Sequence, residues 1–138
     1  MPQFSATSKA RLITCHPDIQ RLFNEVIKYR DCTIISGQRG EAEQNELFRR
    51  GMSQKKFPFS KHNSKPSVAA DVMPYFDCEP HIRWDDVKSS YNFVGYVQAI
   101  ADELGIKIRS GSDWDSDLDF GDQSFIDVAH FELVLDDK

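Results

Sequence analysis

Two short segments, far apart in the sequence, carry residue types that could together bind a metal ion and use it for hydrolysis. The first contains His62 and Asp71, and the second contains Asp127 and His130. A catalytic zinc ion usually takes three His or carboxylate ligands and leaves a fourth position for water. A further carboxylate nearby can then serve as a general base. The two segments therefore indicate a hydrolytic zinc site.

The surroundings of these histidines separate them from the others in the chain. An isolated histidine is more often a structural or surface residue than a ligand. His62 lies in a predicted loop just before a strand, and His130 begins another strand. Asp71 occupies a strand position where an unpaired carboxylate would be costly. His16 and His81 lack such neighbours, and we predict that both are surface residues.

Hydrophobic periodicity predicts the elements that must position these side chains. Helical spacing indicates helices, and short runs rich in β-branched residues indicate strands. The longest helix is predicted to bury a stripe that includes Val87, Val94 and Leu104. This order predicts an α+β fold in which helices flank a small antiparallel sheet, with both chain tips outside the folded part. The predicted helices are 17–29, 40–50 and 84–104, and the predicted strands are 32–35, 68–75, 106–108 and 130–135.

Length, composition and charge limit the class of protein. With 138 residues, 40% hydrophobic and 28% charged, the chain is predicted to fold as one domain, residues 1–138, with a real core. The net charge of −5 argues against nonspecific nucleic-acid binding, which needs a basic face. The locally basic pairs Arg49-Arg50 and Lys55-Lys56 are predicted to be solvated surface.

The cysteines and the apolar runs indicate the compartment. Cys15, Cys32 and Cys78 are odd in number and form no Cys-x-x-Cys pair, so neither a disulfide framework nor a thiolate zinc site is predicted. The first residues lack a signal-peptide pattern, and no apolar run approaches the ~18–20 residues that span a bilayer. We expect synthesis in the cytoplasm and no membrane insertion.

These motifs together resemble a known enzyme family. The pattern is similar to the zinc D,D-carboxypeptidase and dipeptidase group, which shares its fold with the hedgehog signalling domain. Within that group it most resembles the phage L-alanyl-D-glutamate peptidases, which act as endolysins. The resemblance covers nearly the whole chain. It is carried by Ser60-x-His62, Ala70-Asp71, Asp127-x-x-His130-x-Glu132, Ser36-Gly37-Gln38-Arg39, Gly111-Ser112-Asp113-Trp114-Asp115 and Phe131-Glu132-Leu133.

The resemblance implies a role for each of the central site residues. It implies that His62, Asp71 and His130 bind zinc and that Asp127 is the general base or acid. Arg39 would steady developing negative charge or a substrate carboxylate. The alternative for Arg39 is a structural salt bridge to a helix acid. His62 and Asp71 are nine residues apart, more than in the short form of the family pattern, and a loop before the strand can absorb the difference.

Three more residues are assigned around this centre. Glu132, two residues after His130, is expected to be its hydrogen-bonding partner rather than a ligand. Ser60 and Trp114 are expected on the substrate side. For Trp114, a loop aromatic packed on the core is the open alternative.

An acidic segment leaves two interpretations open. Its aspartates at alternate positions resemble the first half of a calcium loop, and the phage peptidases it resembles carry an acidic loop in this place. However, Leu118 stands where a calcium loop has glycine, and no Glu closes the loop. The segment is either a calcium site or a solvated acidic loop. Its residues are Asp113, Asp115, Asp117, Asp119 and Asp122.

The function that the resemblance implies is zinc-dependent hydrolysis of the peptide stem of bacterial peptidoglycan at the L-alanyl-D-glutamate bond. The enzyme would be a monomer that acts at the cell wall in phage lysis, after a holin has opened the membrane. Two alternatives stay open: a D-alanyl-D-alanine carboxypeptidase, and a non-catalytic, zinc-stabilised wall-binding module.

Overall fold

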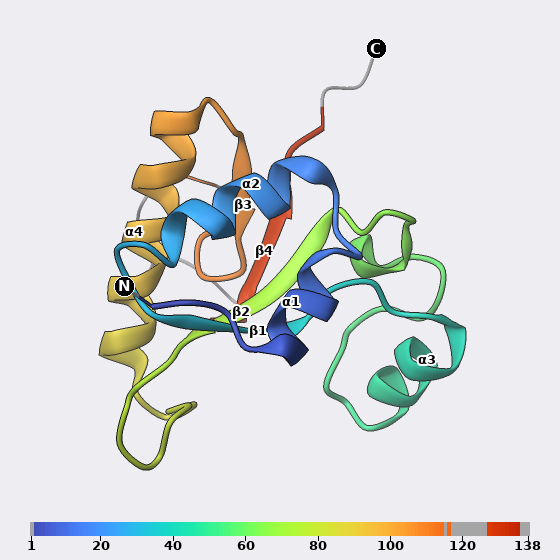
Figure 1. The fold of residues 1–138 in the computed structure, drawn as a ribbon. Helices are drawn as coiled ribbons and strands as arrows, with labels where there is room; N and C mark the ends of the chain where they lie inside the picture. The colour runs from blue at the N-terminus through green and yellow to red at the C-terminus, as the bar shows by residue number, and fades with distance from the viewer. Residues whose placement is uncertain (1, 115, 117–126, 136–138) are drawn as a thin grey trace.

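The computed structural model describes residues 2–114, 116 and 127–135. Helices and strands are interspersed along these residues, with two helices first and two strands last (Figure 1). They are α1 Ala6–Leu12, α2 Pro17–Val26, β1 Cys32–Ser36, α3 Glu41–Arg49, the 3-10 turn η1 Lys61–Asn63, β2 Ala69–Pro74, α4 Val87–Leu104, β3 Ile108–Ser110 and β4 His130–Leu133.

The four strands of the described residues form one sheet in the order β1-β2-β4-β3. Each neighbouring pair is antiparallel. The register places Asp71 of β2 opposite His130 of β4, and opposite Ser36 of β1 across an irregularity that follows Ile34. The predicted antiparallel α+β fold is confirmed, and its central strand pair already joins two of the candidate ligands.

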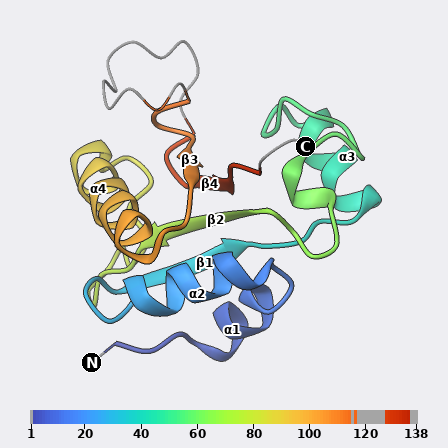
Figure 2. The same cartoon turned by 90° about the horizontal axis from the view of Figure 1, so that it is seen from above.

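Helices α1, α2 and α4 enclose the hydrophobic core against this sheet. Figure 2 shows α1 and α2 on one side of the sheet, while α3 lies at the opposite end of the molecule from α4. The centre of the core is a cluster of three buried phenylalanines: the Phe131 ring lies 5.6 Å from Phe23 of α2 and 6.1 Å from Phe93 of α4. Edge-to-face pairs of this kind add about 0.5–1.5 kcal/mol each beyond their burial. They fix β4, and hence His130, against the helices.

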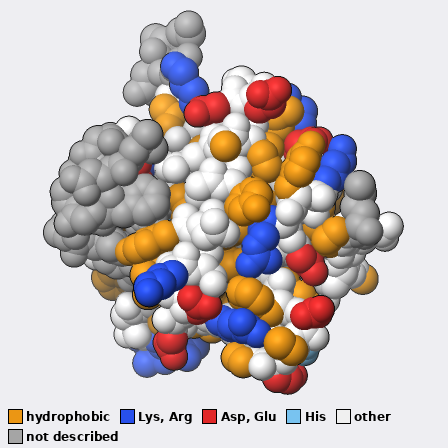
Figure 3. All heavy atoms as spheres, turned by 90° about the vertical axis from the view of Figure 1, so that its left-hand side faces the viewer, with side chains coloured by type: hydrophobic (Ala, Val, Ile, Leu, Met, Phe, Trp, Pro, Cys, Tyr) orange, Lys and Arg blue, Asp and Glu red, His pale blue; other side chains and the backbone are white. Residues whose placement is uncertain are grey.

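The long helix begins and ends at capping residues. The Asp86 carboxylate accepts the Ser89 N–H at 3.0 Å, and Gly105 ends the helix in the left-handed conformation at φ +72°. The predicted stripe was partly wrong. Val87 is 45% exposed, whereas Phe93 is buried, because the face turned to the sheet follows the spacing 90, 93, 94, 97 and 101. Figure 3, seen from this side, shows hydrophobic side chains dispersed among charged ones.

The N-terminal helix α1 was not predicted, since the first residues were expected to lie outside the fold. Its polar side chains bind the edge strand β1. Ser8 Oγ accepts the Ile34 N–H at 3.0 Å, and Arg11 Nη1 donates to the Ile34 carbonyl at 3.0 Å. The helix thereby covers backbone groups of β1 that no strand of the described residues pairs.

The remaining predicted boundaries shift by a few residues. Helix α2 ends at Val26 rather than at residue 29, and β3 covers Ile108–Ser110 rather than 106–108. Strand β4 ends at Leu133, two residues early. The cysteines are free, as expected. No helix of the described residues is long and apolar enough to cross a membrane.

Candidate active site

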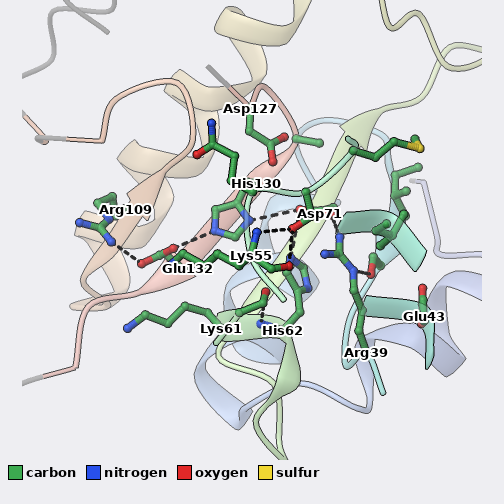
Figure 4. A pocket seen from close by; sticks show the side chains of 18 of the residues that line it. Arg39, Glu43, Lys55, Lys61, His62, Asp71, Arg109, Asp127, His130 and Glu132 are labelled. Carbon is green, nitrogen blue, oxygen red and sulfur yellow. Dashed lines mark hydrogen bonds and ion pairs between the residues drawn. The ribbon is translucent and has the colours of Figure 1, made fainter. Parts of the chain in front are cut away.

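Three side chains of types that bind metal ions come together from three different elements (Figure 4). His62 comes from η1, Asp71 from β2 and His130 from the first position of β4. Asp71 Oδ1 lies 3.3 Å from His62 Nε2 and 3.4 Å from His130 Nδ1. One ligand atom from each of the three lies within 4.8 Å of the others. The group could hold a metal ion, and the nine-residue spacing between His62 and Asp71 does not separate them.

A capped turn holds His62 in place. Ser60 Oγ accepts the His62 N–H at 3.2 Å, and Asn63 Oδ1 accepts the Ser60 N–H at 3.0 Å, which is a capping box. The Arg39 N–H donates to the His62 carbonyl at 2.8 Å. The backbone of His62 is therefore fixed on both sides.

Hydrogen bonds on the outer side of each imidazole decide which nitrogen faces the centre. His62 Nδ1 lies 2.8 Å from the Gly37 carbonyl, which can only accept, so this nitrogen carries the proton and Nε2 is left with its lone pair. His130 Nε2 lies 2.8 Å from Glu132 Oε1, so the neutral ring directs its Nδ1 lone pair at the centre. When both rings are neutral, as metal binding requires, both lone pairs face Asp71.

The two carboxylate oxygens of Asp71 have different surroundings. Oδ2 accepts a hydrogen bond from Arg39 Nη2. Oδ1 is buried and accepts no hydrogen bond from the described residues, although both imidazole nitrogens point toward it. A buried carboxylate oxygen without a donor is costly. A cation placed between this oxygen and the two imidazoles would satisfy it, so the residues present fit a metal ion.

Charges around the centre keep Asp71 and Glu132 ionised. Burial alone would raise the pKa of Asp71, but its two histidine neighbours and Arg39 hold that pKa well below its usual range. Burial opposes ionisation of Glu132 as well, yet His130 and Arg109 lower its pKa to about 2. The Arg109 Nη2 to Glu132 Oε2 distance is 2.8 Å. Arg39 therefore stabilises the carboxylate of Asp71, and Arg109 stabilises that of Glu132.

The titration of His130 follows from the same neighbours. Burial would lower its pKa, but Asp71 and Glu132, on either side of the ring, raise it to about 9 in the metal-free protein. A metal ion at this centre displaces a proton from the ring, because imidazole binds metals in its neutral form.

Asp127 lies in the turn that leads into β4, and its environment differs from that of Asp71. Burial raises the pKa of its carboxyl, and the negative charge of Asp71 raises it further. A group whose pKa is moved toward neutrality is suited to exchanging protons during catalysis. Asp127 lines the same cavity as the three candidate ligands.

Because Gly111 has no side chain, the turn that carries Asp127 can pack directly against its backbone. A Cβ at position 111 would lie 2.2 Å from the Asp127 carbonyl oxygen and 3.0 Å from the His130 Cβ. The Gly111 N–H donates to the His130 carbonyl at 2.7 Å, and the Asp127 N–H donates to the Gly111 carbonyl at 2.9 Å. Only glycine fits between the Asp127 carbonyl and the His130 side chain.

A cavity of about 710 Å³ opens over this centre. A volume of this size is typical of sites that hold a small molecule or a short peptide. Ser60 and Trp114, expected on the substrate side, both line it. The Trp114 ring lies 5.4 Å from the His130 ring, and the Arg109 guanidinium lies 5.4 Å from Trp114.

The other predicted residues occupy definite places. Glu132 lies beside His130 Nε2, and Arg39 donates to Asp71 rather than to a helix acid. His16 caps α2 and His81 stacks on Tyr75, so both are half-buried structural residues outside the site. Asp113 is buried. The other proposed calcium ligands, Asp115, Asp117, Asp119 and Asp122, lie outside the described residues, and calcium binding stays a prediction.

Several cavity residues were missed from the sequence. Arg109 lies opposite Glu132 in the β3–β4 register, a pairing that a correct alignment of the two strands would have revealed. Lys55, Lys61 and Trp84 also line the cavity. Adjacency to His62 was the one signal available for Lys61.

Comparisons with known proteins agree with this geometry. A family model described as phage L-alanyl-D-glutamate peptidase matches residues 1–134. The L-alanyl-D-glutamate peptidase of Escherichia phage T5 is 30% identical over 137 residues, which are 96% of this chain and 98% of that protein. The crystal structure of the Serratia marcescens L-Ala D-Glu endopeptidase ChiX superposes with a TM-score of 0.73 at 25% identity and covers 96% of this chain and 90% of that one.

Proposed function

This chain belongs to the phage L-alanyl-D-glutamate peptidase family, and from that membership we propose that it hydrolyses the L-alanyl-D-glutamate bond in the peptide stem of bacterial peptidoglycan. The observation that carries the proposal is the convergence of His62, Asp71 and His130 in a cavity that Asp127 also lines. Such a centre serves hydrolysis better than binding alone, because it combines a metal site with a carboxylate whose pKa is raised.

Zinc is the metal that we propose for this centre. Two imidazole nitrogens and one carboxylate oxygen are a common catalytic zinc set that leaves an open position. A zinc ion held there would supply Lewis acidity for the scissile carbonyl and for an attacking water, whose pKa such ions lower toward ~7. Glu132 supports the proposal, since it fixes the ring of His130 from the outer side.

The protein side chains would divide the proton transfers and the charge stabilisation. Asp127 would accept a proton from the attacking water and return it to the leaving amine. Arg39 would hold Asp71 in place and add positive charge beside the centre. Loss of a group that stabilises developing negative charge typically costs about 10²- to 10³-fold in rate. Ser60 and Trp114 would contact the substrate from the cavity wall.

We further propose that residues 1–138 act as one monomeric catalytic domain in phage lysis. The family description and the phage T5 relative support this role. The protein would be made in the host cytoplasm and would reach the wall once a holin has opened the membrane. Expression in a host should leave cells intact until a holin or a permeabilising agent is added. Lysis without either would contradict the dependence on a holin.

Product analysis on purified cell-wall sacculi tests the activity. We expect the zinc-loaded protein to create new amino groups on D-glutamate, identified by mass spectrometry. Release of free D-alanine would instead indicate a D-alanyl-D-alanine carboxypeptidase. Binding to sacculi without any new terminus would indicate a non-catalytic wall-binding module. Intact activity after zinc-selective chelation would refute the metal-dependent mechanism.

A further inference from the structure

Two of the four lysines and arginines among the described cavity-lining residues form no ion pair with an acid. The four residues are Arg39, Arg109, Lys55 and Lys61. Arg39 pairs with Asp71, and Arg109 pairs with the acid opposite it in the sheet. Neither lysine forms an ion pair with an acid in the described part of the chain. The charges of the two lysines are therefore available to a ligand.

Arg39 is poorly placed to take a substrate carboxylate, although it also carries a positive charge. Its Nε donates to Ser36 Oγ at 2.9 Å, its Nη1 to Gln44 Oε1 at 3.4 Å, and its Nη2 to Asp71. Each nitrogen of the guanidinium already has a protein partner. Binding a second carboxylate would weaken the hold of Arg39 on Asp71.

Lys61 is the better placed of the two lysines. It directly precedes His62 in η1, and its carbonyl accepts the Val68 N–H and the Ser64 hydroxyl, each at 3.3 Å. Its side chain is half-buried, whereas that of Lys55 is exposed. In Figure 4 the Lys61 side chain extends away from Arg39. Because the residue is half-buried and lies on a fixed turn directly before a candidate metal ligand, water screens its charge less than that of an exposed lysine, and it binds an anion more strongly.

The proposed substrate supplies such an anion. Glutamate has two carboxyl groups, and a peptide chain uses one of them for the next bond, so the D-glutamate residue next to the scissile bond keeps one free carboxylate. We propose that the Lys61 ammonium binds this carboxylate and so selects D-glutamate on the amine side of the bond. The inference rests on the proposed function. Lys55, which is more exposed, contributes less.

Two matched peptides test the inference on the wild-type protein. One contains L-alanyl-D-glutamate with the free carboxylate, and the other carries a carboxamide at that carboxyl group. A site that pairs a charge with a ligand group discriminates against the analogue that lacks it. We expect kcat/KM to be roughly 10- to 100-fold higher for the carboxylate peptide. This comparison needs no variant, so it stands even if a substitution disturbs folding.

Variants assign the preference to Lys61. Lys61→Met should lower kcat/KM for the carboxylate peptide, mainly through KM, until the variant no longer distinguishes the two peptides. Lys61→Arg should restore part of the preference. Lys65→Met is the matched control, because Lys65 is exposed in the same loop and is not among the cavity-lining residues. It should behave as wild type.

The outcomes separate the inference from the proposed function. Equal cleavage of both peptides by the wild-type protein would leave the function standing and overturn the role of Lys61. A Lys61→Met variant that lost both activities in the same proportion would also overturn it, since that pattern indicates a structural effect on His62. If the wild-type protein exposed no D-glutamate amine in either peptide, the proposed function would fail and the inference with it.

Discussion

At the scale of single residues, the site depends on Asp71 using its two oxygens for different purposes. Oδ2 is bound by Arg39, and Oδ1 faces two imidazole lone pairs. Each interaction alone would leave half of a buried carboxylate unsatisfied. Asp71 and His130 are opposite each other in the sheet, so two of the three candidate ligands lie on paired strands, and the third, His62, lies on a capped turn. Ligands supported in this way are held rigidly.

Asp127 is the residue whose removal should separate metal binding from turnover. Asp127→Asn removes the proton acceptor without removing any of the three candidate ligands. We expect zinc content to stay at the wild-type level and kcat to fall by about 10²- to 10⁴-fold. Metal analysis and steady-state kinetics on the same preparation measure both. Asp102→Asn, at an exposed position of α4, is the control, and an active Asp127→Asn variant would refute the role.

Glu132 should tune metal affinity without touching the metal. Its carboxylate accepts from His130 Nε2 at 2.8 Å, and loss of such partners typically costs 10- to 100-fold in affinity. We expect that loss in Glu132→Ala and a smaller one in Glu132→Gln, whose amide oxygen can still accept. Arg109, left without Glu132, is 39% exposed and can reach water. Competition with a chromophoric chelator measures the zinc Kd, and an unchanged Kd in the alanine variant would contradict this role.

At the scale of elements, close approach and helix propensity predict opposite effects for two glycine substitutions. In Gly111→Ala, the new Cβ would meet the Asp127 carbonyl at 2.2 Å, so the turn carrying Asp127 and His130 must move. We expect destabilisation by about 1–3 kcal/mol or more and a weaker zinc Kd. Gly95 lies exposed in α4, and no atom lies within 4 Å of a Cβ there. Gly95→Ala should stabilise by about 0.5–1 kcal/mol.

Denaturant unfolding of both variants checks these signs. The Gly95→Ala protein also serves as the control for zinc affinity, which should not change because α4 supplies no candidate ligand. A Gly111→Ala variant with wild-type stability would show that the turn can shift without cost.

The elements that could be predicted from the sequence carry their own local signals. Strand β2 is a run of apolar residues around one aspartate, and α4 lies between the Asp86 cap and Gly105. Helix α1 has an N-cap, Ser5, but Ser8 and Arg11 also stabilise it through hydrogen bonds to β1, which sequence spacing cannot reveal. A short polar helix of this kind depends on its tertiary partners.

The same distinction applies to the site. His62, Asp71 and His130 were identified by residue type and by resemblance, since few residue types bind zinc. Arg109 and Lys61 were missed, because arginine and lysine occur on every protein surface and only the strand register and the cavity give them a role.

At the scale of the whole molecule, a metal ion at this centre would link parts of the chain that are distant in sequence. Its ligands come from η1, β2 and β4, and β4 also packs its Phe131 between α2 and α4. The unfolded chain cannot hold the three ligands together. Binding energy at the centre should therefore appear as stability of the entire fold.

Thermal unfolding of the metal-free protein with added zinc measures this linkage. At a free zinc concentration of about 100 times Kd, the native state gains about 2.7 kcal/mol, which raises Tm by on the order of 10 °C for a chain of this size. His130→Ala should abolish most of the rise. His81→Ala is the matched control, because His81 is half-buried and stacks on Tyr75 away from the centre, so the rise should persist. An equal rise in both variants would mean that zinc binds elsewhere on the protein.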